Sequence, residues 1–378
     1  MLMSEEIKIV PVSTKKDLNR FIKFPWTVYR GEKKYENWVP PLLMGERDLF
    51  NKKKDPFYTH AETQLFLAYR GETLTGRIAA IIDYAYIEYQ KDESGFFGFF
   101  ETLDDQAAAD ALFKAAEDWV REKGYQSIKG PMNPTTGKTI GCLIDSYDIP
   151  PIIEMPYNTE YYPSMIEKCG YGKSKDLFCY RMDKKLKLSD KMLRVAEIVK
   201  KRYNITIKPI DMKKWDETVE LIRDMYNEAW ADNWGFVPWS KEEFEHLAKD
   251  LKMIAIPELV LIVYMGDEPV GFTIPLPDFN QVFIKMNGRL FPTGLFKILT
   301  GKKKIDMIRT AILGVRKHAQ NKGLDAIMVK EIYERGDRLG MRGSELSWIL
   351  EDNINLTNLL ENWGAEHYRT YRIYEKKI

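Results

Sequence analysis

A short basic loop between two regular segments carries the clearest chemical signal in the sequence. An apolar run from Met307 to Val315 predicts a buried strand, and a helical pattern follows from Asp325 through Leu339. The loop between them holds one glycine and three cations: Gly323, Arg316, Lys317 and Lys322. Free N–H groups at a helix start, beside cationic side chains, suit a pyrophosphate. The loop therefore predicts binding of a phosphorylated ligand, with an ordinary strand–turn–helix corner as the alternative.

The same loop resembles the acyl-CoA loop of the GNAT superfamily, the GCN5-related N-acetyltransferases, whose pattern is Q/R-x-x-G-x-G/A. Here the six positions run from Gln320 to Asp325, and Asp325 replaces the usual small residue. A carboxylate there would repel phosphate unless it points outward as a helix cap. The resemblance implies that the loop, the strand before it and one later helix start contact coenzyme A. The residues concerned are Leu313, Gly314, Val315, Arg316, Gln320, Asn321, Lys322, Gly323, Leu324, Asp325 and Asn353.

Acyl transfer from a thioester to an amine needs a base for the amine proton, a donor for the carbonyl oxygen and an acid for the leaving thiolate. In the GNAT fold one strand flanks the cofactor, and the resemblance places Glu345 on it. Glu345 and Ser347 alternate onto one face of that strand. Glu351, at the end of the strand, is the competing base. A surface ion pair is the alternative role for either glutamate.

The acid is less clearly marked than the base. A tyrosine on the last helix often serves as acid in this superfamily, and the corresponding position here is Leu360. The resemblance therefore implies a substitute, either Tyr368 or Tyr371. A core or edge tyrosine is the alternative for each.

Composition limits the classes of partner. The chain has 378 residues, which favours two domains, and its 57 basic and 56 acidic residues leave a net charge of +1. This balance argues against a nucleic-acid partner. Three cysteines without metal-ligand spacing are typical of a cytoplasmic protein and predict no metal site.

Three short segments recur in the same order at a nearly constant offset, which predicts an internal duplication. The pairs are Ile9–Asp17 with Ile207–Trp215, Gly71–Gly76 with Gly266–Gly271, and Glu167–Gly170 with Glu361–Gly364. We predict two copies of one α+β fold with a mixed sheet, residues 1–183 and 184–378, joined in the charged segment Asp183 to Asp190. Each copy places helices before a hairpin and then alternates strand and helix, which is the GNAT order.

Motifs over nearly the whole chain resemble the bacterial YghO-like family of GNAT-related proteins. They are Trp38–Leu42, Asp55–Phe57 with His60–Glu62, Gly76–Ala80, Gly95–Glu101, Gly130–Pro134, Met155–Asn158 with Tyr161 and Tyr162, Ser347–Asn353 and Tyr371–Tyr374. This resemblance implies an N-acyltransferase that uses acetyl-CoA or a longer acyl-CoA. Some relatives look like long-chain acyltransferases of lipid amines such as sphingoid bases, so a small-molecule or lipid amine is the expected acceptor.

The corresponding loops of the two halves differ. In the first half, the strand Gly95–Glu101 meets its helix through Asp104 and Asp105, which satisfy the helix N–H groups and make the corner anionic. We therefore expect CoA on the second half, while the first half shapes the substrate or packs against its twin. Candidate substrate residues in the first half are His60, Asn133, Tyr157, Asn158 and Tyr162, with a purely structural cluster as the alternative.

The segment from Phe279 to Lys304 has no counterpart in the first half. It crowds four apolar residues into one helical turn and then becomes basic: Leu295, Phe296, Ile298 and Leu299. This pattern predicts either a lid over a long acyl chain, with Phe296 against the substrate, or a patch on a membrane surface whose lysines meet anionic head groups. A core helix packed between the two copies is the alternative.

Two other functions fit the same motifs. The missing tyrosine and Asp325 favour a non-catalytic protein that binds acyl-CoA or another ligand. Tandem GNAT folds also serve aminoacyl-tRNA-dependent transfer, although the balanced charge argues against a tRNA partner. The acceptor amine, the acyl length and the oligomeric state do not follow from the sequence.

Overall fold

The computed structural model describes residues 6–183 and 190–378, which form two compact units. The first unit comprises Met1–Leu177, Phe283–Leu295 and Arg369–Ile378, and the second comprises Phe178–Val282 and Phe296–Tyr368. These units do not follow a single cut of the chain at 183/184, because the last strand of each sequence half contributes residues to both. Most of the predicted junction from Asp183 to Asp190 lies outside the described residues, so the boundary of the duplicated halves stays a prediction.

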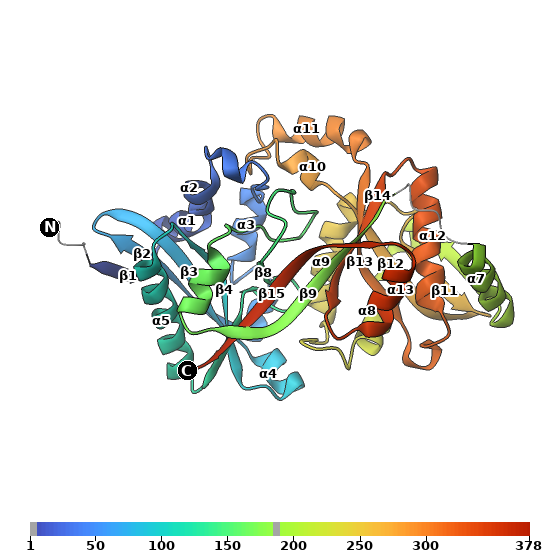
Figure 1. Ribbon diagram of the computed structural model, residues 1–378, viewed down its shortest axis with the longest axis horizontal. Helices are drawn as coiled ribbons and strands as arrows, with labels where there is room; N and C mark the ends of the chain where they lie inside the picture. The colour runs from blue at the N-terminus through green and yellow to red at the C-terminus, as the bar shows by residue number, and fades with distance from the viewer. Residues whose placement is uncertain (1–5, 184–189) are drawn as a thin grey trace. The chain divides into compact units, whose positions relative to one another are not determined.

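The first unit is a mixed sheet with one long helix packed against it (Figure 1). Its strands are β1 (Ile7–Pro11), β2 (Ala61–Arg70), β3 (Thr73–Asp83), β4 (Ser94–Thr102) and β5 (Ser127–Gly130), followed in the sheet by parts of β15 (Glu366–Lys377) and β9 (Gly172–Asp183). Short strands β6 (Met132–Asn133), β7 (Thr139–Ile140) and β8 (Cys142–Leu143) complete the set. β4 and β5 pair in parallel, whereas β1 to β4 pair antiparallel.

Helix α5 (Gln106–Glu122) covers one face of this sheet. Leu112, Ala116 and Val120 recur at helical spacing, and all three are buried against the strands. The other helices of the unit are α1 (Lys15–Lys23), α2 (Pro25–Tyr29), α3 (Leu43–Leu49), α4 (Tyr84–Gln90) and α6 (Tyr162–Lys168).

The second unit repeats this plan. Its strands β10 (Ile205–Pro209), β11 (Leu261–Met265), β12 (Glu268–Pro277), β13 (Met307–Val315) and β14 (Gly343–Leu350) lie in chain order across the sheet, and the end of β9 lies beside β14. Only the β13–β14 pair among these five is parallel. Its helices are α7 (Asp190–Arg202), α8 (Trp215–Ala229), α9 (Lys241–Ile254), α10 (Asn280–Phe283), α11 (Gly294–Gly301), α12 (Leu324–Arg338) and α13 (Ile354–Asn362).

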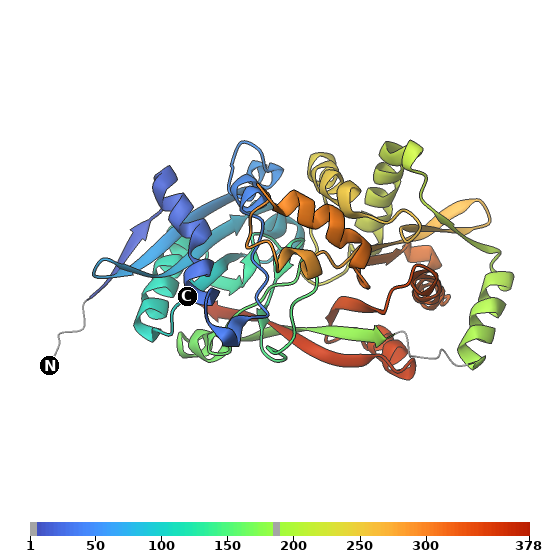
Figure 2. The same cartoon turned by 90° about the horizontal axis from the view of Figure 1, so that it is seen from above.

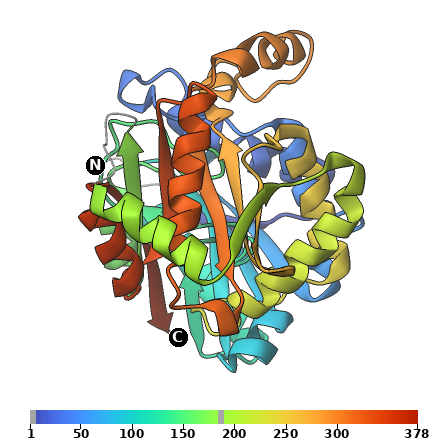
Figure 3. The same cartoon turned by 90° about the vertical axis from the view of Figure 1, so that its right-hand side faces the viewer.

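Helices cover both faces of the second sheet. α8 and α9 pack side by side (Figure 2), and α12 runs alongside the strands with α7 slanting across it (Figure 3). The side chains of β13 explain this division, because Ile308 and Leu313 pack with residues of α12 whereas Ile312 faces α8 and α9. The strand and helix predicted around the basic loop are confirmed to within one residue at each end.

Helix α11 leaves most of its large apolar side chains exposed. Phe296 is 69% exposed and Leu299 is 65% exposed, and Phe291 and Leu295 are also exposed. This exposure disfavours the alternative of a core helix. Across the described parts of the chain, no helix has both the length and the hydrophobicity that crossing a membrane requires.

Candidate active site

Strands β13 and β14 separate part-way along their length. Their parallel pairing runs from Met307 opposite Gly343 to Thr310 opposite Leu346, although β13 continues to Val315 and β14 to Leu350. A β-bulge lies at the same point, because Pro275 of β12 pairs with Thr310 while Ile274 pairs with Ile312. We call residues 311–315 of β13 and 347–350 of β14 the strand separation. Its backbone edge on β13 is available to an extended ligand.

The N-terminus of α12 follows directly after β13 and its loop. Gly323 is the N-cap residue in the left-handed region at φ +77°, and no side chain caps the helix. The first helical hydrogen bond runs from the N–H of Ile327 to the carbonyl of Gly323 at 3.3 Å. Within the described residues, the N–H groups of Leu324, Asp325 and Ala326 therefore have no acceptor. Such a helix end fits the pyrophosphate of coenzyme A.

The cations of the loop are already paired within the second unit. The Arg316 guanidinium donates to the Glu228 carboxylate, and the Lys317 ammonium lies 2.7 Å from Asp232. His318 Nε2 lies 3.3 Å from the carboxylate of Glu268, and the Lys322 ammonium donates to the His318 carbonyl. These contacts hold the loop in place and offset part of its charge. We therefore expect the helix amides, rather than the paired side-chain cations, to be the principal anion donors.

A buried polar cluster lies at the strand separation, on the face opposite α12. Glu345 is 2% exposed, and its carboxylate accepts hydrogen bonds from the Ser347 hydroxyl at 2.7 Å and from the Tyr368 hydroxyl. Arg309 donates through Nε to the Ser347 hydroxyl at 3.1 Å, and its guanidinium lies over the Trp348 ring at 4.9 Å. Ser347 therefore connects a buried guanidinium with a buried carboxylate.

The two candidate acid tyrosines have different environments. Tyr371 belongs to the first unit, where it is fully buried and its hydroxyl donates to the Pro156 carbonyl at 3.0 Å. This environment favours the structural alternative for Tyr371, whereas the Tyr368 hydroxyl does meet Glu345, so Tyr368 stays the candidate acid. Glu351 lies in the turn after β14, and Asn353 caps α13 by accepting from the N–H of Leu356 at 3.3 Å.

Arg309 is the member of the cluster that the sequence reasoning missed. It interrupts an apolar strand, and it is 4% exposed. A charged side chain inside a buried strand needs partners, because burial of an unpaired charge costs several kcal/mol. A charged residue within an apolar strand was the available signal, because it indicated a partner on the neighbouring strand that carries Glu345.

The first unit lacks the features of the second at both corresponding places. Its parallel pair β4–β5 also ends early, but Asn133 fills the space by accepting the N–H of Phe99 at 2.6 Å. A Cβ on Gly98 would lie 1.8 Å from the Met132 carbonyl oxygen, which shows how tightly the chain closes there. At the start of α5, Asp105 accepts the N–H of Ala108 and forms an ion pair with Arg70 at 2.8 Å.

The other predicted substrate residues of the first unit make contacts within the fold. His60 Nδ1 lies 3.0 Å from the fully buried Asp83 carboxylate. Tyr157 donates to the Tyr147 carbonyl at 3.1 Å. The Asn158 amide bonds both the N–H and the carbonyl of Leu143. These contacts favour the structural alternative for His60, Tyr157 and Asn158.

Tyr162 belongs to a second buried carboxylate cluster, centred on Glu101. The hydroxyls of Tyr162 and Tyr29 donate to Glu101 at 2.8 and 2.6 Å, and Arg77 lies 4.0 Å from the same carboxylate. Burial raises the pKa of Glu101, and the Arg77 charge opposes that rise. Asn133 fills the strand gap and Asp105 caps the helix beside this cluster, which agrees with the expectation that CoA binds the second half.

Comparison with known proteins places the chain in a family. It is 35% identical over 388 residues to a protein of Caulobacter vibrioides (strain NA1000 / CB15N) named bacterial ceramide synthase, covering 99% of this chain and 98% of that one. It is 33% identical over 372 residues to Protein YghO of Escherichia coli (strain K12), covering 96% and 94%. The chain belongs to the YghO-like family.

A solved structure of another protein has the same fold as this YghO-like protein. A tandem GNAT protein from the clavulanic acid biosynthesis pathway superposes with a TM-score of 0.52 and 10% identity over 98% of both chains. The predicted mixed α and β architecture, with a tandem GNAT fold, is thereby confirmed. No family model matches the chain.

Proposed function

We propose that this YghO-like protein is an acyl-CoA-dependent N-acyltransferase whose acceptor is a lipid amine. The observation that carries the proposal is the second unit's combination of an uncapped α12 N-terminus, a strand separation and the buried Glu345 cluster. The relative named bacterial ceramide synthase supports a sphingoid-type amine as acceptor and a long acyl chain as donor group.

The thioester arm would lie along the edge of β13. The α12 amides hold the pyrophosphate, and the pantetheine arm runs along residues 311–315 toward the Glu345 cluster. A backbone N–H at the bulge, where β13 loses its partner strand, would donate to the thioester carbonyl oxygen. The acyl carbon is then next to the only carboxylate of β14, Glu345.

Glu345 and Tyr368 divide the proton chemistry between them. The amine nitrogen attacks the acyl carbon, the C–N bond forms and the C–S bond breaks. Glu345, directly or through water, accepts the amine proton, while the Tyr368 hydroxyl supplies a proton to the leaving thiolate. Because Tyr368 already donates to Glu345, the proton gained by the carboxylate can restore the tyrosine hydroxyl. Arg309 acts through Ser347 to position the carboxylate.

Product analysis tests this function directly. The purified protein, incubated with palmitoyl-CoA and a sphingoid base, is expected to release free CoA and form the amide in equal amounts, both measured by mass spectrometry. Binding of acyl-CoA without amide formation for any tested amine would favour the ligand-binding alternative. Transfer only from aminoacyl-tRNA would favour the alternative of an aminoacyl-tRNA-dependent transferase.

We further propose that α11 makes a peripheral membrane contact. Phe291, Leu295, Phe296 and Leu299 are exposed, and Lys302 to Lys304 follow in the chain. An apolar patch beside cations suits a bilayer surface with anionic head groups. Contact of α11 with a membrane surface would bring the protein close to a lipid amine.

Phe296→Asp is expected to weaken binding to vesicles of anionic phosphatidylglycerol by about tenfold, because a carboxylate replaces a ring that would enter the interface. Sedimentation with vesicles measures the effect. Met253→Asp is the matched control, since Met253 is 72% exposed on α9, away from the α11 sequence. Equal loss in both variants would point to general charge repulsion and against an α11 contact.

A further inference from the structure

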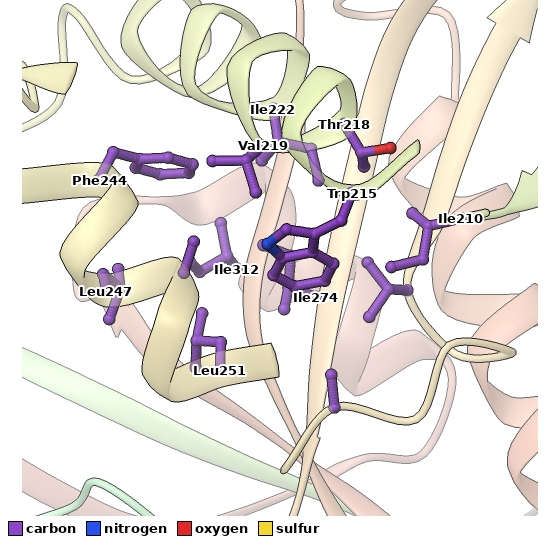
Figure 4. A pocket seen from close by; sticks show the side chains of 13 residues that line it. Ile210, Trp215, Thr218, Val219, Ile222, Phe244, Leu247, Leu251, Ile274 and Ile312 are labelled. Carbon is purple, nitrogen blue, oxygen red and sulfur yellow. The ribbon is translucent and has the colours of Figure 1, made fainter. Parts of the chain in front are cut away.

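An apolar cavity lies between the helix pair α8–α9 and the sheet of the second unit (Figure 4). Its walls include Trp215 and Val219 of α8, Ala248 and Leu251 of α9, Ile274 of β12 and Ile312 of β13. The one hydroxyl among its lining side chains, that of Thr218, donates to the Lys214 carbonyl of its own helix at 2.9 Å. The cavity therefore suits a ligand made of hydrocarbon.

The cavity adjoins the strand separation. Ile312 directly follows the bulge, and Thr310 is the last residue of β13 that pairs with β14. Because strand side chains alternate and Ile308 packs on the α12 side, Arg309 lies on the face that carries α8 and α9. Arg309 bonds Ser347, which bonds Glu345, so the polar cluster lies on that same face. An acyl carbon placed beside Glu345 thus has apolar space next to it.

The size of the cavity indicates that it must widen. Its volume is about 30 Å³, roughly twice what one water molecule needs by the same measure. A long chain can enter only if α9 moves away from α8. At the outer edge the Lys252 ammonium lies over the Trp215 ring at 5.1 Å, a contact between the two helices that would break on opening.

We propose that this cavity is the inner end of the acyl-chain site and that α8 and α9 determine which chain lengths bind. The inference rests on the proposed function and names its donor group: the saturated chain of a fatty acyl thioester. Helix α11, another apolar segment, leaves Leu295, Phe296 and Leu299 exposed. We therefore assign chain length to the helix pair, and the lid interpretation of residues 279–304 stays an untested alternative.

Calorimetry with acetyl-CoA, octanoyl-CoA and palmitoyl-CoA, below their micelle concentrations, tests the proposal. The parent protein is expected to bind palmitoyl-CoA at least about tenfold more tightly than acetyl-CoA. Ala248→Trp fills the cavity from α9, so it should abolish that preference and leave acetyl-CoA affinity within about twofold. Lys249→Trp is the matched control, because it adds the same ring at the exposed neighbouring position. Should Ala248→Trp fail to fold, Val219→Phe narrows the cavity from α8 instead.

A second measurement uses the unaltered protein. Palmitoyl-CoA with a photoreactive diazirine at its terminal carbon should label peptides of α8 and α9, and not α11. The assignment of the cavity would be overturned by a folded cavity-filling variant that keeps the palmitoyl preference, or by labelling confined to α11. In that case binding of acetyl-CoA would still uphold the proposed function. Failure of every CoA thioester to bind the parent would overturn both.

Discussion

Glu345→Gln is expected to lower kcat by about 100-fold or more without changing the dissociation constant for acyl-CoA. Glutamine keeps the shape of the side chain, and its one carbonyl oxygen can still accept one of the two hydrogen bonds that Ser347 and Tyr368 donate to the carboxylate, but it cannot take a proton from the amine. Steady-state kinetics with a lipid amine and calorimetry with palmitoyl-CoA measure the two quantities separately.

Glu351→Gln is the matched control for that experiment. Glu351 lies six residues further along, in the turn after β14, and the change removes the same charge from the neighbourhood. We expect turnover within about twofold of the parent, because a surface charge contributes little at such a site. If Glu351→Gln instead lowered kcat by about 100-fold, and Glu345→Gln kept the parent's kcat, the base would be Glu351.

Gly323→Val is expected to weaken binding of acyl-CoA by about tenfold or more, an effect of about 1.4 kcal/mol. Gly323 holds φ +77° at the N-cap of α12, and a β-branched residue resists this conformation. The helix start should therefore shift and move the N–H groups of Leu324 to Ala326 away from the pyrophosphate. Calorimetry with acetyl-CoA isolates this effect from the acyl chain.

Gly340→Val provides a control with the same strain at the other end of the same helix. Gly340 has φ +80°, and no atom lies within 4 Å of its added Cβ. Both valine variants should lose about 1–2 kcal/mol of unfolding free energy, but only Gly323→Val should lose CoA affinity. Equal CoA affinity in the two variants would remove the loop from the binding site.

The fold was more predictable than the site because repeats and hydrophobic periodicity can be recognised in a single sequence. The apolar run before the basic loop and the helical pattern after it gave β13 and α12 almost to the residue. Helix α7 was missed: it begins at Asp190, where the predicted junction ends, and precedes the first predicted strand of the second copy. The exchange of strand ends between the units was also missed, because pairing partners so far apart in the chain leave no local pattern.

Local alternation placed Glu345 and Ser347 on one face, and their hydrogen bond at 2.7 Å agrees. It could not choose between Tyr368 and Tyr371, because both lie on the final strand and only the fold assigns Tyr371 to the first unit. The cavity under α8 and α9 was equally hidden. Its residues come from separate helices and strands, and each of them reads in the sequence as ordinary core.

The last ten residues of the chain set the order in which the protein can be completed. Arg369–Ile378 belong to the first unit, where Tyr374 pairs with Gly130 and Lys377 pairs with Ser127. During synthesis, the edge of β5 therefore stays unpaired with β15 until the second unit has emerged from the ribosome. A nascent chain in that state exposes an open sheet edge, the kind of surface that invites aggregation. Premature termination close to the C-terminus would accordingly damage the unit that was synthesised first.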